Sequence, residues 1–291
     1  MDIHGIQAFL AVSETGSFSR AADLLCITQP AISKRIQSLE HSLGITLFDR
    51  VGKSVRLTEA GQALLPSSRR IIGEISESER IISNLRKTTR GTLNLATSHH
   101  IGLHRLPHVL RDYAASYPDV ELKVSFMDSE QACQQIIAGD IELAMITLPD
   151  EPDERLEMKT LWNDPLSIVV SKRHPLASAD KPAIKQLLQY SAVLPAQGTY
   201  TRKLIDKALH PGEPLKILLE THYLETIKAM VQTGLGWSML PLSMLDRSLV
   251  SLDIRHARTS RQLGVVMHNM RTKSNAANAM INLLMMHSDL K

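Results

Sequence analysis

The sequence of 291 residues predicts two structural parts, an N-terminal all-α winged helix-turn-helix with a long helix behind it and a two-lobed α/β region. Three observations predict this fold class. Two short amphipathic segments joined by a tight turn precede a hairpin with basic residues at its tip. A long segment keeps an apolar seam at heptad spacing. Beyond residue 91, strand-like and helix-like segments alternate, which is typical of an α/β fold.

The first three helices are predicted from caps and apolar spacing. Residues 3–14 form a helix whose inward residues are Ile3, Ile6, Phe9, Leu10 and Val12. Ser17 is a good N-cap for the next helix, whose apolar side chains recur at helical spacing: Phe18, Ala21, Ala22 and Leu25. Cys26 and Ile27 form the turn, and Thr28 caps a third helix with Pro30 in its first turn.

The third helix is amphipathic in a way that suits the DNA major groove. Its inner stripe is Ile32, Ile36, Leu39 and Leu43, and its outer face carries Gln29, Ser33, Lys34, Arg35 and Gln37. Amides and hydroxyls can contact base edges, whereas cations contact phosphates. A surface helix pair with solvated charges is the alternative. The next segment favours DNA binding, because residues 47–50 and 54–57 flank Val51-Gly52-Lys53 as a basic hairpin.

A long helix is predicted from Thr58-Glu59 to about Lys87. Its heptad seam is Leu64, Ser68, Ile71, Ile75, Ser78, Ile82 and Leu85. Such a seam predicts pairing with a second copy of the chain, and burial against the C-terminal part is the alternative. Pairing would fix the distance between the third helices of two copies, which would each read one half of the DNA site. This predicts a roughly palindromic DNA site. Pro66 removes one helical hydrogen bond near the start.

The remainder alternates between strands and helices. Strands are expected at 92–96, 120–124 and 143–146, with helices at 101–117 and 129–138. A second unit starts at 166–170 and has helices near 183–189, 201–209 and 223–233. Residues 264–267 and a helix at 275–287 return to the first unit. This pattern predicts a mainly parallel sheet, two lobes joined by crossing strands, and a cleft between the lobes.

Residues 1–60 resemble the N-terminal domain of LysR-type transcriptional regulators. The residues that carry the resemblance are Phe9, Ser17-Phe18, Ala21-Ala22, Leu25, Thr28-Gln29-Pro30-Ala31, Ser33, Ile36, Leu39-Glu40, Leu43-Gly44, Leu47-Phe48, Arg50 and Leu57-Thr58-Glu59-Ala60-Gly61. The resemblance implies that the third helix enters the major groove of double-stranded DNA and that the hairpin touches the minor groove or backbone. The expected DNA-binding residues are Ser17, Thr28, Gln29, Pro30, Ser33, Lys34, Arg35, Arg50 and Lys53.

The same resemblance extends over nearly the whole chain. It is carried by Leu106-Pro107, Tyr117-Pro118-Asp119-Val120, residues 139–144, His174-Pro175-Leu176-Ala177 and residues 234–241. It implies a periplasmic-binding-protein-like domain that takes a small effector between its lobes, and a homo-oligomer that is commonly a tetramer. The expected domains are 1–58 for DNA binding (helix-turn-helix about 18–37), 59–89 for the linker helix and 91–291 for the effector. Lobe one covers about 91–161 and 268–291, and lobe two about 162–267.

Three polar stretches follow predicted strands and could bind the effector, since ligands of α/β sheets lie beyond the carboxyl ends of strands. The candidate effector residues are Thr97, Ser98, His99, His100, Gln197, Thr199, Thr201, Arg202, Thr221 and His222. Their hydroxyls and positive or titratable groups favour a small anionic metabolite. The alternative is that the Ser and Thr residues only cap helices.

The histidines suggest a second alternative. His100, His104 and His108 would share one face of a continuous helix, with His99 beside them, and such a group could bind zinc, nickel or copper. No carboxylate or cysteine joins them at ligand spacing, and Pro107 interrupts the helix. We therefore expect no metal site, and the metal-responsive regulator remains an alternative.

Composition limits the remaining function classes. Residues 1–90 hold 12 Lys and Arg against 9 Asp and Glu, while residues 91–291 hold 21 of each, so the net charge of +3 belongs to the helix-turn-helix part. Cys26 and Cys133 are expected to be buried, reduced thiols. No apolar run of 18 residues and no leader is evident, which predicts a cytoplasmic protein without membrane contact. No catalytic motif calls for a cofactor or an enzyme. The rival from another class is a solute-binding or enzymatic α/β protein whose N-terminal helices make only protein contacts.

Overall fold

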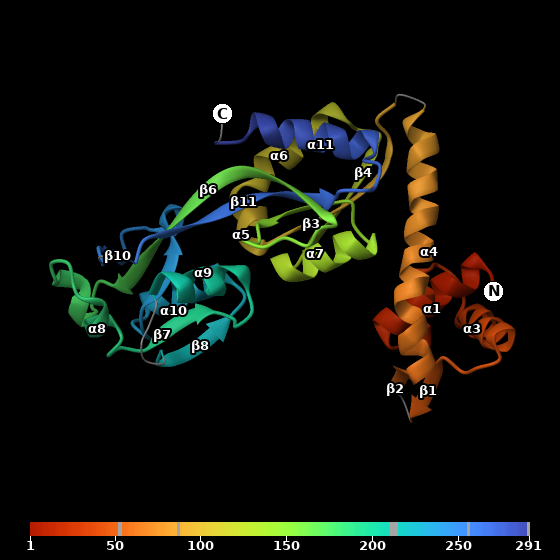
Figure 1. Cartoon of the computed structure of the whole chain (residues 1–291), viewed down its shortest axis with the longest axis horizontal. Helices are drawn as coiled ribbons and strands as arrows, with labels where there is room; N and C mark the ends of the chain where they lie inside the picture. Colours follow the sequence, from red (N-terminus) through yellow and green to blue (C-terminus); the bar gives the residue numbers. More distant parts are fainter. Residues whose placement is uncertain (52–53, 86–87, 210–214, 255–256, 290–291) are drawn as a thin grey trace. The chain divides into compact units, whose positions relative to one another are not determined.

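The computed structural model describes residues 1–51, 54–85, 88–209, 215–254 and 257–289 (Figure 1). The chain divides into two compact units, one made of Met1–Arg86 with Ala138–Asp140 and a second made of Lys87–Ile137 and Ile141–Lys291. Each helix in the described part of the chain is too short or too polar to span a lipid bilayer.

The first unit opens with three helices, α1 (Ile3–Thr15), α2 (Phe18–Leu24) and α3 (Gln29–Leu43). The Ser17 hydroxyl accepts the N–H of Arg20 at 3.4 Å and caps α2, as expected. Cys26 has a positive φ of 52° and turns the chain between α2 and α3. The helices enclose one core, which includes Phe9, Val12, Phe18, Ala21, Ile32, Ile36 and Leu39.

Three of the residues that were expected to face inward or to be buried are exposed. Ile3 is 46% exposed and Leu43 is 39% exposed, because each lies in the end turn of its helix beyond the outermost buried residue. Cys26 is exposed rather than buried, since it occupies the turn between two helices, whereas Cys133 is buried as expected.

The predicted basic hairpin is confirmed as β1 (Phe48–Val51) paired antiparallel with β2 (Ser54–Leu57), and we call it the wing. The Glu40 carboxylate of α3 accepts the N–H of Leu47 at 2.7 Å. The Phe48 ring packs against Phe9 and Phe18 at centroid distances of 5.4 and 5.9 Å. The root of the wing is therefore fixed to the same core as α3.

Helix α4 (Glu59–Asn84) follows the wing. The Thr58 hydroxyl accepts the N–H of Gly61 at 3.0 Å, which caps the helix as predicted. Its first turns pack on the helical core through Ala60, Leu64 and Leu65. Its far end leaves Ile81 and Ile82 exposed by 46% and 60%.

The second unit is built on two sheets. The strands are β3 (Gly91–Thr97), β4 (Val120–Phe126), β5 (Leu143–Thr147), β6 (Leu156–Ser171), β7 (Ala192–Pro195), β8 (Ile217–Thr221), β9 (Ser238–Pro241), β10 (Leu249–Leu252) and β11 (Thr259–His268). The larger sheet has the strand order β10-β6-β11-β5-β3-β4, with β9 also paired to β6, and the smaller sheet pairs β7 with β8. The helices are α5 (His99–His104), α6 (Leu106–Ser116), α7 (Ser129–Ala138), α8 (Ile184–Leu187), α9 (Tyr200–Leu209), α10 (Leu224–Gln232) and α11 (Asn275–Met286).

Two lobes share the long strands β6 and β11, which cross from one to the other as predicted (Figure 1). Lobe one has a core that includes Leu95, Val109, Tyr113 and Met280. The core of lobe two includes Ile168, Leu194, Ile205 and Trp237.

The expectation of a mainly parallel sheet is wrong. β3 pairs parallel with β4 and β5, but β6, β9, β10 and β11 make antiparallel pairs. The two crossing strands run in opposite directions between the lobes, and this makes the large sheet mixed.

Candidate nucleic-acid interface and ligand pocket

The start of α3 presents a polar, exposed surface. Gln29, Pro30 and Lys34 are exposed, and Ser33 is half-buried beside them. The Gln29 side-chain amide donates to the Ser33 hydroxyl at 3.0 Å, which holds the amide beside the residue that precedes Lys34. Thr28 occupies the N-cap position, but its side chain makes no capping hydrogen bond to the described first turn. Its hydroxyl and the free N–H groups of this turn can therefore serve an external partner.

The other expected DNA-binding residues are placed differently. The Ser17 hydroxyl is already engaged in capping α2. Arg35 is half-buried next to the inner stripe of α3. Lys53 and the side chain of Arg50 lie outside the described part of the chain. Arg56 on β2 is exposed and adds a cation to the wing that the expected set did not include.

A polar pocket lies between the two lobes, at the carboxyl ends of strands from both. Lobe one contributes segments after β3 and β4 and the last residue of β5, and lobe two contributes the end of β7 and segments after β7 and β8. The lining consists of Ser98, His99, His100, Met127, Asp128, Ser129, Glu130, Thr147, Pro195, Thr199, Tyr200, Thr201, His222, Leu224 and Arg261. The cavity volume is about 50 Å³. Entry of a metabolite would therefore require the lobes or their side chains to move apart.

Arg261 lies at the floor of the pocket on the crossing strand β11, opposite Asp164 on β6. Both side chains are buried, and the guanidinium Nε donates to the Asp164 carboxylate at 3.0 Å. Another guanidinium nitrogen, Nη1, donates to the Thr201 hydroxyl at 3.2 Å. Burial lowers the pKa of Arg261, while Asp164 acts in the opposite direction and the guanidinium stays protonated.

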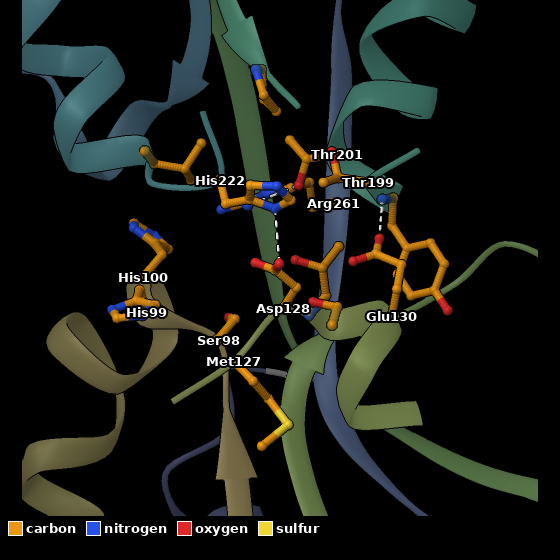
Figure 2. Close-up of a pocket in the computed structure, with 15 residues that line it drawn as sticks. Ser98, His99, His100, Met127, Asp128, Glu130, Thr199, Thr201, His222 and Arg261 are labelled. Carbon is orange, nitrogen blue, oxygen red and sulfur yellow. Dashed lines mark hydrogen bonds and ion pairs between the residues drawn. The ribbon is translucent and has the colours of Figure 1, made fainter. Parts of the chain in front are cut away.

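Figure 2 shows two of the polar contacts that join the lobes across the pocket. The Asp128 carboxylate, after β4, pairs with His222 Nδ1, after β8, at 2.8 Å. The Glu130 carboxylate on α7 accepts the N–H of Tyr200, the first residue of α9. The Glu130 carboxylate of lobe one thus lies at the N-terminus of α9 in lobe two, where backbone N–H groups favour an anion.

Six of the ten expected effector residues line this pocket: Ser98, His99, His100, Thr199, Thr201 and His222. Thr97, Gln197, Arg202 and Thr221 do not. Thr97 is fully buried, and its hydroxyl donates to the Ser98 carbonyl at 3.2 Å. Gln197 is exposed, and Thr221 is half-buried outside the lining.

Arg202 binds residues of its own lobe in place of the expected ligand. Its Nε donates to Asp206 at 2.8 Å, its Nη1 donates to the Pro195 carbonyl at 3.1 Å, and the guanidinium also pairs with Glu220. Its charge is therefore balanced inside lobe two.

Sequence reasoning missed Asp128, Glu130 and Arg261. Asp128 and Glu130 directly follow the strand at 120–126, so the rule used for the other stretches could have found them. Arg261 lies within a strand, and its position depends on the register against Asp164.

The predicted row of histidines is broken. Arg105 ends α5 and α6 begins at Leu106, so His108 lies on a different helix from His100 and His104. The His99 ring packs against Phe126 and Tyr223 at 5.4 and 4.5 Å. His100 and His104 alone remain neighbours, with ring centroids 4.7 Å apart.

An exposed polar helix in a winged helix-turn-helix, followed by two α/β lobes around a polar pocket, defines the class of ligand-binding transcriptional regulators. Comparison with known proteins agrees with this class. Residues 3–62 match the bacterial regulatory helix-turn-helix family of the LysR type, and residues 86–289 match the LysR substrate-binding domain family. The chain belongs to the LysR family of DNA-binding transcriptional regulators, whose members combine a DNA-binding domain with an effector-binding domain.

Relatives of known sequence cover nearly the whole chain. A probable RuBisCO transcriptional regulator of Synechocystis is 34% identical over 93% of this chain and 82% of its own length. The transcriptional activator CmpR of the same organism is 25% identical over 99% of this chain and 96% of its own length.

Two solved structures share the fold. A full-length OxyR variant of Pseudomonas aeruginosa gives a TM-score of 0.72 at 20% identity and covers 98% of this chain and 94% of its own. Full-length CbnR complexed with its target DNA gives a TM-score of 0.67 at 20% identity and covers 99% of this chain and all of its own.

Proposed function

We propose that this regulator binds a near-palindromic promoter site as a homo-oligomer and responds to a small anionic metabolite held between its two α/β lobes. The observation that carries the DNA-binding part is the exposed start of α3. There Gln29, Ser33 and Lys34 combine an amide, a hydroxyl and a cation within little more than one helical turn. The amide and hydroxyl would contact base edges, and Lys34 would contact a phosphate. Thr28 and Pro30 lie beside them, and Arg50, Lys53 and Arg56 of the wing would contact the DNA backbone.

Pairing of two copies through α4 is supported by the apolar residues at its far end. Ile82 and Leu85 of the heptad seam, and Ile81 beside them, are each at least 46% exposed within a single chain. An exposed apolar seam on a long helix is stabilised when a second helix covers it. Two paired copies, or a tetramer made of two pairs, would present two α3 helices to one duplex and so favour an inverted repeat.

The DNA part is tested by selection from a random duplex pool with purified full-length protein. We expect the recovered sequences to converge on two half-sites in inverted orientation. Recovery of no preferred sequence, or of a single half-site, would contradict the paired reading helices.

The anionic character of the effector is supported by the contact between Glu130 and α9. The N-terminus of α9 already binds the Glu130 carboxylate, and the Thr199 and Thr201 hydroxyls and Arg261 line the same pocket. An effector carboxylate would take the place of Glu130, while its remaining polar groups would contact His99, Ser98 or His222. We propose that Asp128 and Glu130 then exchange their contacts with His222 and Tyr200 for others, which changes how the two lobes are held together.

The effector part is tested by thermal shift with a panel of small carboxylates. A ligand at 100 times its dissociation constant should stabilise the protein by about 2.7 kcal/mol. Thr201→Val should abolish this shift, whereas Thr221→Val, a matched change outside the pocket, should retain it. If both variants respond like the wild type, the assigned pocket is wrong.

We further propose that the protein acts in the cytoplasm and catalyses no reaction. A transcriptional regulator must reach chromosomal DNA, and known members of this family are regulators.

A further inference from the structure

His100, His104 and Glu225 form a compact cluster at the side of the ligand pocket. We propose that this cluster binds one divalent transition-metal ion of the zinc, cobalt or nickel class, and that the ion ties α5 of lobe one to α10 of lobe two. This site is separate from the α9 end of the pocket and does not depend on which effector binds there.

The three donor groups have the spacing of a metal site. Glu225 Oε1 lies 3.4 Å from His100 Nδ1 and 3.2 Å from His104 Nε2. One ligand atom from each residue lies within 4.8 Å of the others. Tetrahedral zinc with bonds of about 2.1 Å has ligand atoms about 3.4 Å apart. The two distances to Glu225 therefore already match this geometry.

The donor chemistry selects the class of ion. Two imidazole nitrogens and one carboxylate suit zinc, cobalt or nickel, whereas magnesium and calcium prefer oxygen donors alone. Sites with three protein ligands of this kind commonly complete the coordination with water. His104 is 47% exposed and the Glu225 side chain 33%, so solvent can reach the ion, whereas His100 is buried.

A hydrogen-bonded His–Glu–His contact without metal is the competing interpretation. In that case one carboxylate oxygen serves two imidazoles as a polar contact between the lobes. The two interpretations make different predictions for His104. A metal site needs the His104 imidazole nitrogen as a ligand, whereas the hydrogen-bonded contact between the lobes can persist through His100 and Glu225 alone.

An ion at this position would act on the lobes. Its ligands come from both sides of the cleft, and His100 also lines the pocket. The ion would favour the arrangement in which α5 and α10 approach each other. Any change that it makes in effector affinity must be matched by an equal change that the effector makes in metal affinity.

Cobalt titration of the full-length, tag-free protein after dialysis against a chelator tests the site, without DNA or effector. We expect one cobalt ion per chain with the visible absorption of a tetrahedral N₂O-type site, and displacement by zinc. His104→Ala and Glu225→Gln should each weaken binding by about tenfold or more. His108→Ala is the matched control, because His108 lies on α6 and outside the cluster, and this variant should bind cobalt like the wild type.

Far-ultraviolet circular dichroism and the melting temperature verify that each variant folds, and Glu225→Gln preserves the shape of the side chain. The proposal is overturned if the wild type takes up no stoichiometric cobalt. It is equally overturned if folded His104→Ala and Glu225→Gln bind cobalt as tightly as the wild type. Neither result bears on DNA or effector binding, so failure of this site is distinguishable from failure of the proposed function.

Discussion

Arg261 combines a buried ion pair with a place in the lining of the pocket. Its guanidinium is almost completely buried, pairs with the buried Asp164 and reaches the Thr201 hydroxyl at the pocket floor. A buried ion pair contributes little net stability, but removal of one partner leaves the other charge uncompensated.

Arg261→Ala should therefore lower the free energy of unfolding by about 3 to 5 kcal/mol, because Asp164 is left buried without its cation. Urea unfolding followed by fluorescence measures this change. Arg258→Ala is the control, since Arg258 pairs with Asp253 on the surface and its loss should leave the midpoint nearly unchanged. Equal effects of the two variants would show that the Arg261–Asp164 pair is not the cause.

Gln29 tests base recognition at the same scale. Gln29→Ala should cost about 1 to 3 kcal/mol at one base pair of a selected site and relax the preference there. Gln62→Ala, which removes an exposed amide from α4, should change neither affinity nor preference. Competition binding with single-base variants of the duplex measures both. A uniform loss over all sequences would indicate that Gln29 contacts the backbone instead.

At the scale of elements, α4 has a packed start and an exposed far end. Its first turns belong to the core of the helix-turn-helix unit, whereas its far end exposes isoleucines. We expect the far end to join two copies of the chain, because exposed apolar side chains at heptad spacing gain stability when a second helix buries them.

Ile82→Glu should dissociate the oligomer, since it places a charge in the apolar seam. Sedimentation velocity at micromolar concentration should show a smaller species than the wild type. Ala63→Glu, which adds the same charge at an exposed position off the seam, should sediment like the wild type. An unchanged profile for Ile82→Glu would exclude α4 as the pairing surface.

The elements also show what could be predicted from the sequence. The helix-turn-helix and the wing were predictable because caps, apolar spacing and turns are local signals: Ser17, Thr58 and the hairpin at 48–57 behave as expected. The strand β9 and the direction of β6 and β11 were not, because strand pairing depends on residues distant in sequence. The same limit explains Arg261 and the contact of Glu225 with two histidines on α5.

At the scale of the whole molecule, the excess of positive charge and the polar pocket belong to different parts of the chain. The excess of basic residues lies within residues 1–90, and the pocket lies in the second unit. An effector can change DNA binding only to the extent that it binds one arrangement of the protein more tightly than another.

The central claim is that α3 binds duplex DNA, and the salt dependence of binding tests it most directly. The logarithm of the affinity of the full-length protein for a selected duplex should fall linearly with the logarithm of the salt concentration. Lys34→Ala should reduce the steepness of this slope by about one phosphate contact, whereas Lys159→Ala in the second unit should leave it unchanged. An affinity that is independent of salt, or the same slope for Lys34→Ala and the wild type, would contradict the account.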